Sequence, residues 1–571
     1  MPTLLDRIGA KLKVLYGDDQ ASLILTHLQS LVTQAKQPNR TTVAITEQDV
    51  ILITYGDQVS KSAEAPLATL RYFLNQTIHD QINTVHILPF YPYSSDDGFS
   101  VIDYYAVNPA LGDWSHIHDL HQDFRLMFDA VFNHISAQSE WFQAFLRDEA
   151  PYNHFFVMVD PNTDLSLVRR PRALPLLTPF ATKRGTEHVW TTFSADQIDL
   201  NAANPEVLLE LIRILLFYVA QGADLIRLDA IGFLWKTIGT DSIHLPETHL
   251  IVQLLRDVLD LAAPDTILMT ETNVPHHENI SYFGDGTNEA QMVYQFSLPP
   301  LILHTFSTGD ATALSGWATG IQRVSDQTSF FNFTASHDGI GVQPARGILS
   351  EAEITALVNR VEAHGGLVSY KHNSDGSRSP YELNISYFDA ITHPDVTASQ
   401  PEIAIQRFLC SQAIMLAFMG VPGVYFHSLF GSRSDHAGVQ QFGHNRAINR
   451  QKLDADTLLT DLKNPATLRY QVYMQFLKLL SIRTHEPAFH PVGQQTILDY
   501  GQQIFALERR SPDGQNRVIA LHNVQGEPVE VKISAGGRDL LTGQLYTPHV
   551  TITLQPYQIF WLKVSDSGSS G

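Results

Sequence analysis

Eight short apolar runs, separated by longer amphipathic stretches, are the feature of this sequence that most restricts its fold. Short apolar runs that alternate with helical stretches are typical of parallel sheets, because each parallel strand needs a long crossover connection. Eight such units predict an α/β fold, a closed (β/α)8 TIM barrel, whose active site lies where the strands end. The runs are residues 50–57, 84–92, 125–134, 223–231, 266–273, 292–299, 329–338 and 420–430.

Charged and polar residues collect at the C-terminal ends of most of these runs. Turns are polar in any protein, which accounts for Ser, Asn and Gly at such positions. It accounts less well for the concentration of carboxylates, histidines and an arginine. We therefore expect a functional site built from these residues, which are Asp57, Asp129, Asn133, His134, Arg227, Asp229, Glu271, His337 and Asp338.

The remaining segments predict additions to the barrel. Residues 1–47 have apolar residues at helical spacing, residues 135–215 exceed one crossover helix, and residues 339–404 are rich in turn residues. Past residue 485 the sequence changes to short alternating strands with hairpin signals. We predict an N-terminal helical extension (1–47), the catalytic barrel (48–134 and 216–484), an inserted B subdomain after strand three (135–215), a loop insertion over the active site (339–404) and a C-terminal antiparallel β domain (485–566).

Composition excludes several classes of partner. The 571 residues carry a formal net charge of −21, which argues against nucleic-acid and anionic-membrane binders, since these show basic patches. No run approaches the roughly 20 apolar residues of a membrane span. The single cysteine, Cys410, and an N-terminus without signal-peptide character indicate a reducing, cytoplasmic location. The sequence does not set the oligomeric state, and a homodimer is compatible with it.

Two opposite charges lie inside one of the apolar runs, "LIRLDAIGF". Arg227 and Asp229 are two residues apart, so on a strand they point to the same face. Buried charges are costly unless they are paired. Two interpretations remain open at this point: a structural ion pair, or a catalytic carboxylate that its arginine neighbour keeps ionised.

Paired carboxylates are what glycoside chemistry requires, one as nucleophile and one as proton donor. We expect Arg227 to lower the pKa of Asp229, which suits a nucleophile. Glu271 follows the apolar "TILMT" without an adjacent cation, so we expect a raised pKa, which suits a general acid. Adjacent strands lie about 4.8 Å apart, close to the roughly 5–5.5 Å between the carboxyl groups of a retaining enzyme. Asp338 offers a third carboxylate for sugar hydroxyls.

Cofactor and metal sites are less well supported. Asp129, Asn133 and His134 are either metal ligands or hydroxyl binders and hydrogen-bond struts. The sequence has no Cys or His pair at a zinc spacing and no glycine-rich phosphate loop of the P-loop or dinucleotide type. We therefore expect neither a metal nor a cofactor.

Four segments, in order along the chain, resemble the conserved regions of the α-amylase superfamily: "DAVFNH", "LIRLDAIGF", "MTETN" and "FTASHD". The similarity covers residues 48–565. Within the superfamily, "VHILPFYPYSSDDGFSVIDYYAVNPALGDW" and "GHNRAINR" resemble segments of the sucrose phosphorylase group. Members of that group form a β-glucosyl-enzyme, which phosphate opens to give α-glucose 1-phosphate.

The resemblance implies a role for each matching residue. Asp229 corresponds to the nucleophile, Glu271 to the acid/base and Asp338 to the transition-state stabiliser. Phe99 corresponds to the aromatic ring that packs on the glucosyl unit. The residues that correspond to its polar ligands are Asp96, His134, Arg227, His337 and Arg446.

Three departures from sucrose phosphorylase resemble the glucosylglycerate phosphorylase branch, in which the acceptor is the anion glycerate. They are the N-terminal extension, "ETNVPHHENISYFGDG" after the acid, and "SPYELN", which places Tyr381 and Glu382 in the acceptor loop. Arg170 and Arg172 in "RRPR" are candidate ligands for anionic phosphate and glycerate, although a solvated surface turn would have the same composition. Arg346 is a weaker candidate.

The expected activity is that of a retaining glucoside phosphorylase, a hexosyltransferase acting on a small α-glucoside, 2-O-α-D-glucosyl-D-glycerate. Its partners would be the glucoside, inorganic phosphate and glucose 1-phosphate. The alternatives are phosphorolysis of sucrose, sucrose 6′-phosphate or glucosylglycerol, a hydrolase or transglucosidase with the same site, and a non-catalytic protein built on the same barrel. The complete set of three carboxylates argues against the last.

Overall fold

A closed barrel of eight parallel strands forms the centre of the molecule, in a computed structural model that describes residues 3–35, 44–172, 175–372 and 377–565. Each strand is hydrogen-bonded to the next along the chain, and the last pairs with the first. Every strand falls inside one of the eight apolar runs, so the barrel prediction is confirmed. The strands are β1 (Ile51–Thr54), β3 (Thr84–Ile87), β4 (Arg125–Ala130), β9 (Ala223–Leu228), β10 (Ile267–Thr270), β11 (Met292–Tyr294), β12 (Ser329–Phe333) and β16 (Val421–Tyr425).

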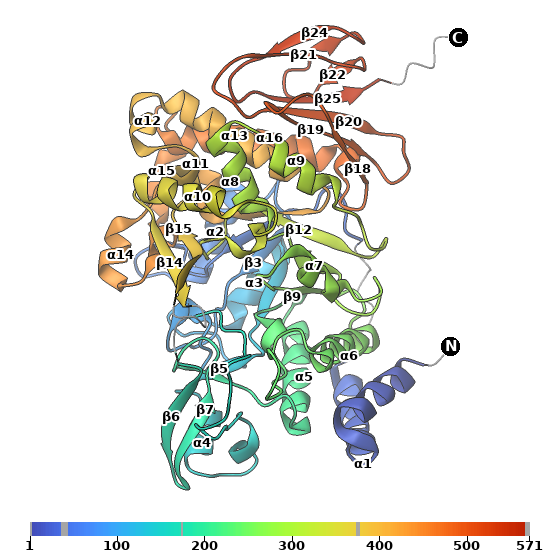
Figure 1. Cartoon of the computed structure of the whole chain (residues 1–571), viewed down its shortest axis with the longest axis vertical. Helices are drawn as coiled ribbons and strands as arrows, with labels where there is room; N and C mark the ends of the chain where they lie inside the picture. Colours follow the sequence, from blue (N-terminus) through green and yellow to red (C-terminus); the bar gives the residue numbers. More distant parts are fainter. Residues whose placement is uncertain (1–2, 36–43, 173–174, 373–376, 566–571) are drawn as a thin grey trace.

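Amphipathic helices surround the barrel and cover its strands (Figure 1). Several of the helices begin with proline in the first turn, where proline is favoured because its missing N–H has no helical partner. Asp113 and Asn204 cap α3 and α5 by accepting from backbone N–H groups. The principal helices are α2 (Pro66–Thr77), α3 (Trp114–Asp123), α5 (Pro205–Ala220), α6 (Pro246–Ala262), α8 (Leu298–Thr308), α13 (Pro401–Ala417) and α16 (Leu468–His485).

The insertion after the third barrel strand folds into short antiparallel elements. Strand β5 (His134–Ser136) pairs with β8 (Gln197–Asp199), β6 (Leu177–Thr182) forms a hairpin with β7 (Gly185–Trp190), and α4 (Glu140–Leu146) lies beside them. In the register of the first pair, His134 is opposite Asp199. The insertion is therefore fastened to the barrel at the C-terminal end of β4, where the active site of such a barrel lies.

The segment expected to be a loop over the active site contains a small sheet and a helix. In the sheet, strand β15 (Arg378–Asn384) lies between β13 (Ile340–Gly341) and β14 (Leu367–His372). In the sequence, α10 (Glu351–Ala363) comes between β13 and β14. The "SYKH" part of β14 carries polar and charged side chains without an apolar alternation, so the sequence does not show the period that identifies a half-buried strand.

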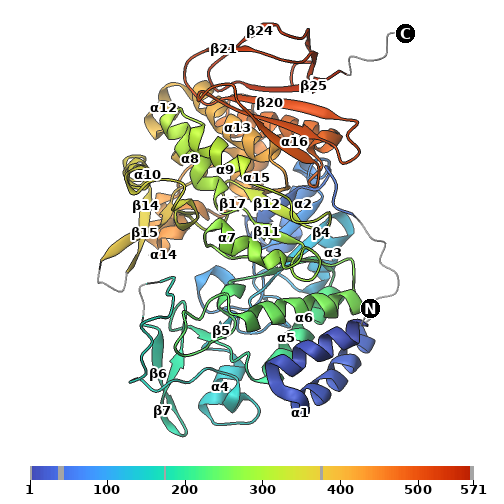
Figure 2. The ribbon, with the colours of Figure 1, turned by 45° about the vertical axis from the view of Figure 1, so that its right-hand side comes forward.

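The two ends of the described chain pack against opposite parts of the molecule (Figures 1 and 2). Helix α1 (Leu4–Ala35) bends at Gly17 and packs on α5 and α6, where Arg7 and Lys11 pair with the buried Asp257. No described helix combines the length and the apolar character that a membrane span needs.

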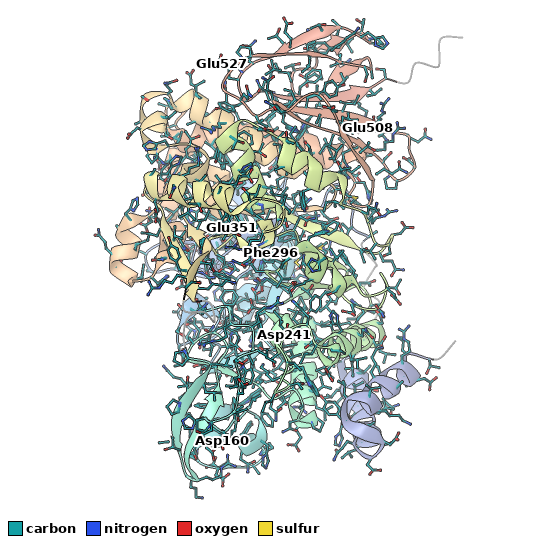
Figure 3. All side chains as sticks on the ribbon, in the orientation of Figure 1. Asp160, Asp241, Phe296, Glu351, Glu508 and Glu527 are labelled. Atoms are coloured by element: carbon teal, nitrogen blue, oxygen red, sulfur yellow. The ribbon has the colours of Figure 1, made fainter. Side chains whose placement is uncertain are left out.

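The C-terminal segment forms a separate antiparallel β layer, as predicted. Figure 3 marks this end by Glu508 and Glu527, with Asp160 of the insertion at the opposite end. The six-stranded sheet has the order β18 (Gln494–Leu498), β19 (Ile504–Arg510), β20 (Arg517–Asn523), β25 (Ile559–Val564), β22 (Gly537–Asp539) and β23 (Leu545–Tyr546), and β21 (Val529–Lys532) pairs with β24 (Thr551–Leu554).

Candidate active site

A cavity of about 380 Å³ lies at the C-terminal ends of the barrel strands. Three parts of the chain contribute to its wall: the strand ends, the insertion after β4 and the small sheet of residues 340–384. The cavity contains charges of both signs. The carboxylates that line it are Asp96, Asp229, Glu271, Glu278 and Asp338, and the cations are Arg169, Arg170, Arg172, Lys371 and Arg446.

Asp229, Glu271 and Asp338 follow the ends of β9, β10 and β12 and line this one cavity. Leu228 and Thr270 are partners in the parallel register, so Asp229 and Glu271 leave neighbouring strands at the same level. The backbone N–H of Ala230 donates to Oε2 of Glu271 at 3.1 Å. This bond holds the glutamate carboxylate next to the residue that follows Asp229.

Arg227 pairs with two aspartates at once. Its Nη1 donates to Oδ1 of Asp229 at 2.8 Å and to Oδ1 of Asp129. Oδ2 of Asp129 also lies 2.7 Å from Nε2 of His86. The arginine is 2% exposed. Arg227 and Asp229 in "LIRLDAIGF" thus form a buried ion pair, and Asp229 is the member that faces the cavity.

Burial raises the pKa of Asp229 well above its usual value, and the nearby carboxylates add to this effect, against the opposing influence of Arg227. The expectation of a lowered pKa is therefore wrong. The physical reason is that the guanidinium is shared with Asp129, while the Asp229 carboxyl is desolvated beside other acids. Burial also raises the pKa of Glu271, as expected from its apolar flank. Asp338 differs, because Arg446, His337 and Arg450 overcome the effect of burial and lower its pKa.

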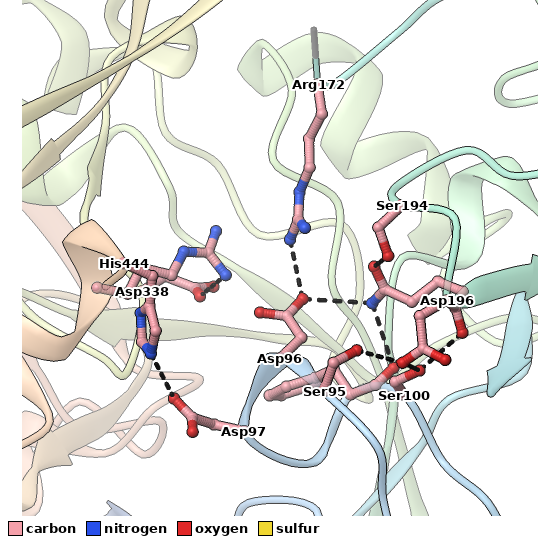
Figure 4. A network of polar contacts seen from close by, with 12 residues as sticks. Ser95, Asp96, Asp97, Ser100, Arg172, Ser194, Asp196, Asp338 and His444 are labelled. Carbon is pink, nitrogen blue, oxygen red and sulfur yellow. Dashed lines mark hydrogen bonds and ion pairs between the residues drawn. The ribbon is translucent and has the colours of Figure 1, made fainter. Parts of the chain in front are cut away.

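Asp96 enters the cavity from a tight turn after β3 (Figure 4). Its backbone has a φ of 54°, and Gly98 follows with a φ of 110°. A Cβ atom at Gly98 would lie 2.6 Å from the carbonyl oxygen of Pro89, so the turn requires glycine. Asp196 of the insertion supports the same turn by accepting hydrogen bonds from Ser94, Ser95 and Ser100.

Arg172 of the insertion reaches Asp96 across the cavity. Its Nη2 donates to Oδ2 of Asp96 at 2.9 Å, and Nε2 of Gln197 donates to the same oxygen at 3.2 Å. Burial acts to raise the pKa of Asp96, but Arg172, Arg446 and Arg450 lower it to about 2. Asp96 is therefore an ionised acceptor near neutral pH.

Two neutral histidines and a phenylalanine line the same cavity. The ring of His337 stacks on that of Phe99 with centroids 4.9 Å apart, and Nε2 of His134 lies 2.9 Å from the Phe99 carbonyl oxygen. Burial lowers the pKa of His134, and it lowers that of His337 to about 3. These side chains offer an apolar face and polar ring nitrogens without positive charge, which suits a sugar.

Arg446 bridges Asp338 and Glu382. Its Nη1 lies 2.6 Å from Oδ1 of Asp338, and its Nε and Nη2 donate to Glu382 at 3.1 and 2.9 Å. The Glu382 carboxylate is 4% exposed and also accepts from the Gly339 N–H. The structure places it behind Arg446 and not on the cavity wall, whereas Tyr381 does line the cavity.

Asn133, a candidate metal ligand in the sequence, serves as a strut instead. Its amide contacts Asp199 of the insertion and the ammonium of Lys236. Lys236 lies 2.8 Å from both Asn133 Oδ1 and Asp199 Oδ2 and 3.3 Å from the Leu234 carbonyl oxygen. This buried lysine joins the insertion to the loop that follows Asp229. No local sequence pattern distinguishes it.

Arg170 and Arg172 lie in the cavity wall, where the phosphate-binding hypothesis requires them. Arg169, from the same basic motif, and Lys371 of β14 also line the cavity, although neither was predicted as a site residue. Arg346 pairs with the exposed Glu351 and is not among the lining residues. The basic motif provided a signal for Arg169, whereas nothing local distinguishes Lys371.

Comparison with known proteins agrees with this geometry. Residues 78–342 match the α-amylase catalytic-domain family. That class combines a parallel barrel with carboxylates at the strand ends, as found here. The chain is 50% identical to glucosylglycerate phosphorylase of Allomeiothermus silvanus, in an alignment that covers 98% of this chain and 99% of that protein. It is 47% identical to glucosylglycerate phosphorylase of Escherichia coli, in an alignment that covers 98% of this chain and 100% of that protein. The chain belongs to the glucosylglycerate phosphorylase family.

A solved structure extends the likeness to related enzymes. Sucrose 6F-phosphate phosphorylase from Thermoanaerobacter thermosaccharolyticum superposes with a TM-score of 0.73 at 25% identity, covering 85% of this chain and 94% of that one. The similarity therefore includes the barrel and most of the additions to it.

Proposed function

We propose that this protein is a retaining glucoside phosphorylase that converts 2-O-α-D-glucosyl-D-glycerate and inorganic phosphate into α-D-glucose 1-phosphate and glycerate. The observation that carries the proposal is the placement of Asp229 and Glu271 on neighbouring strand ends in one cavity, in a chain that matches glucosylglycerate phosphorylases over nearly its whole length. A retaining mechanism requires two carboxyl groups that face the same bond of the substrate, one as nucleophile and one as acid/base.

In the first half-reaction, a carboxylate oxygen of Asp229 attacks the anomeric carbon while Glu271 gives its proton to the departing glycerate oxygen. The product is a β-glucosyl ester of Asp229. One proton is needed on the pair. Burial raises the pKa of both carboxyl groups, those of Asp229 and Glu271, which favours retention of a proton by the pair. We assign that proton to Glu271 when the glucoside is bound, because Asp229 contacts the guanidinium of Arg227 at 2.8 Å and its ionised form is the nucleophile.

In the second half-reaction, a phosphate oxygen attacks the same carbon from the face that glycerate left. The ester bond to Asp229 breaks, and Glu271 accepts a proton if the attacking oxygen carries one. Two inversions retain the α configuration in glucose 1-phosphate. Asp338 stays ionised beside Arg446, where it accepts from glucosyl hydroxyls and stabilises positive charge that develops at the anomeric carbon.

The glucosyl unit fits the inner part of the cavity. Ionised Asp96 and neutral His134 and His337 supply hydrogen-bond acceptors and donors, and Phe99 supplies an aromatic face. Arg227, which the resemblance implied as a polar ligand of the glucosyl unit, is buried and is not among the lining residues, so we assign it a role through Asp229. Glucosyl hydroxyls are recognised by such polar groups around an aromatic platform.

Arginines of the insertion suit the acceptor half of the cavity. Glycerate and phosphate are both anions and occupy that half in turn, while the chain as a whole carries a charge of −21. Local cations must therefore offset an unfavourable overall field. Arg170 and Arg172 line the cavity, and we assign them to this role, with Tyr381 on the same wall.

One assay separates the phosphorylase from a hydrolase. The protein is incubated with glucosylglycerate with and without millimolar phosphate, and glucose 1-phosphate and free glucose are measured. We expect glucose 1-phosphate to dominate when phosphate is present. Mostly free glucose under that condition would refute the proposal. The synthetic direction, with glycerate, fructose, fructose 6-phosphate and glycerol as acceptors, distinguishes the related phosphorylases; fructose preferred over glycerate would refute the choice of acceptor.

A cytoplasmic location and a homodimer belong to the proposal as well. The first is supported by the single buried Cys410, since structural disulfides are rare in reducing compartments. The second is tested by light scattering of the purified chain, in which a monomeric mass would refute it.

A further inference from the structure

The cations that line the cavity differ in whether a carboxylate already holds them. Arg446 pairs with Asp338 and Glu382. Arg172 pairs with Asp96 at 2.9 Å. Arg169 lies 2.6 Å from Glu278 and 3.6 Å from Asp241. A substrate anion that binds to any of these guanidiniums competes with, or shares, an existing ion pair.

Lys371 is in a different situation. Its Nζ contacts a neutral group, Oε1 of Gln343, at 3.3 Å. In the part of the chain that the structure describes, no ion pair involves its ammonium. Burial lowers the pKa of Lys371, and the charges of Arg346 and Arg169 act in the same direction. The charged groups that act on this ammonium are therefore cations, and no carboxylate pairs with it among the described residues.

The position of Lys371 fits the acceptor half of the cavity. It lies on β14 of the small sheet, whereas Arg169 lies in the insertion after β4, and both side chains line the cavity. An oxyanion between them would relieve the mutual repulsion of the two cations and would not displace a carboxylate from Lys371. Burial of part of the site strengthens such a charge-assisted contact relative to bulk water.

We propose that Lys371, together with Arg169 of the insertion, is the anchor for the anionic group of the acceptor: the carboxylate of glycerate in one half-reaction and phosphate in the other. The inference rests on the proposed function and adds a specificity-determining residue to it. Gln343 orients the ammonium through its amide oxygen. The substrate class that this anchor selects is a small hydroxylated oxyanion in preference to a neutral polyol of the same size.

The test compares glycerate with glycerol, which keeps the hydroxyls and lacks the carboxylate. Lys371→Met and Lys371→Arg are assayed in the synthetic direction from glucose 1-phosphate with each acceptor. A hydrogen bond to a charged group corresponds to roughly 10- to 150-fold. We expect Lys371→Met to lower kcat/KM for glycerate by that factor and for glycerol by less than about threefold. Lys371→Arg, which keeps the charge, should recover part of the loss.

A second experiment measures the KM for phosphate. Phosphorolysis of glucosylglycerate by Lys371→Met should show a KM for phosphate raised by a similar factor. Lys61→Met, at an exposed lysine that pairs with Asp456 on the surface, is the matched control and should leave both measurements unchanged. Thermal unfolding of each variant shows whether it folds as the parent protein does.

The outcomes separate this inference from the proposed function. Equal losses with glycerate and glycerol, or no loss with either, would overturn the role of Lys371 while the parent enzyme still forms glucose 1-phosphate. A loss confined to phosphate would overturn the glycerate part and keep the phosphate part. If the parent enzyme releases only free glucose, the proposed function itself fails, whatever the variants do.

Discussion

Replacing Glu382 by glutamine should weaken the binding of the glucosyl unit and leave the acceptor preference unchanged. The Glu382 carboxylate accepts from Nε and Nη2 of Arg446 at 3.1 and 2.9 Å and from the Gly339 N–H at 2.9 Å, and it is 4% exposed. A glutamine oxygen can keep one or two of these bonds, but its NH₂ group would face the guanidinium. The variant therefore loses at least one charge-assisted hydrogen bond and the balancing charge behind Arg446.

The magnitude follows from that loss. A hydrogen bond to a charged group contributes about 1.5–3 kcal/mol, and about 1.4 kcal/mol corresponds to a factor of ten. If Arg446 acts on the glucosyl unit in the transition state, kcat/KM should fall roughly 10- to 150-fold in Glu382→Gln. Because the glucosyl unit is common to every reaction, the factor should be the same for phosphorolysis, for synthesis with glycerate and for synthesis with glycerol.

The assay is the set of three kcat/KM ratios for Glu382→Gln relative to the parent enzyme. Glu351→Gln is the matched control, because Glu351 pairs with Arg346 on an exposed surface. A fall in kcat/KM for synthesis with glycerate, without a fall for synthesis with glycerol, would contradict the reasoning. That result would restore Glu382 to direct contact with the acceptor, which is the role that the resemblance to the acceptor loop implied.

Three further substitutions test other parts of the structure. Arg172→Ala should raise the phosphate KM about tenfold and alter hydrolysis less, and equal effects on both would exclude a phosphate role. Lys236→Met should destabilise the fold by about 3–5 kcal/mol, because it leaves the buried Asp199 carboxylate without its cation. The free energy of unfolding is measured in urea, and a change below about 1 kcal/mol would show that the ammonium is dispensable. The pKa of Asp129 is lowered by Arg227 and His86, against burial, to about 2. The interactions of ionised Asp129 therefore contribute about 2–3 kcal/mol to the free energy of unfolding at a pH above about 4, which is the pKa of an aspartate in the unfolded chain. This contribution is lost as the pH falls toward about 2. Between about pH 4 and about pH 2, the urea midpoint of Asp129→Asn should therefore fall less than that of the parent protein. An equal fall in both proteins would refute the conclusion that Asp129 causes this loss of stability.

The barrel was predictable because its strands are buried on both faces and read as continuous apolar runs. The catalytic carboxylates were predictable for a related reason. Asp229 and Glu271 end such runs, and the ends of parallel strands meet at one edge of the barrel. The sheet around β14 was not predictable, because its strands are polar and lack a clear period.

Residues whose roles depend on partners that are distant in the sequence could not be predicted from it. Lys236 resembles any helix-flanking lysine until Asp199, 37 positions earlier in the sequence, is folded against it. Lys371 and Arg169 approach the cavity from different insertions. The predicted direction of the Asp229 pKa shift was wrong because the sequence does not show that this carboxyl group is buried beside other acids, nor that Asp129 uses the same Arg227 guanidinium.

The most direct test of the mechanism is to trap the glucosyl-enzyme. Glu271→Gln is incubated with α-glucosyl fluoride without phosphate or glycerate, and its peptides are examined by mass spectrometry. Fluoride leaves without a proton from residue 271, whereas water needs a general base to open the ester, so the intermediate should accumulate. The account predicts one added glucosyl unit on the peptide that contains Asp229, and a glucosyl unit on any other residue would contradict it.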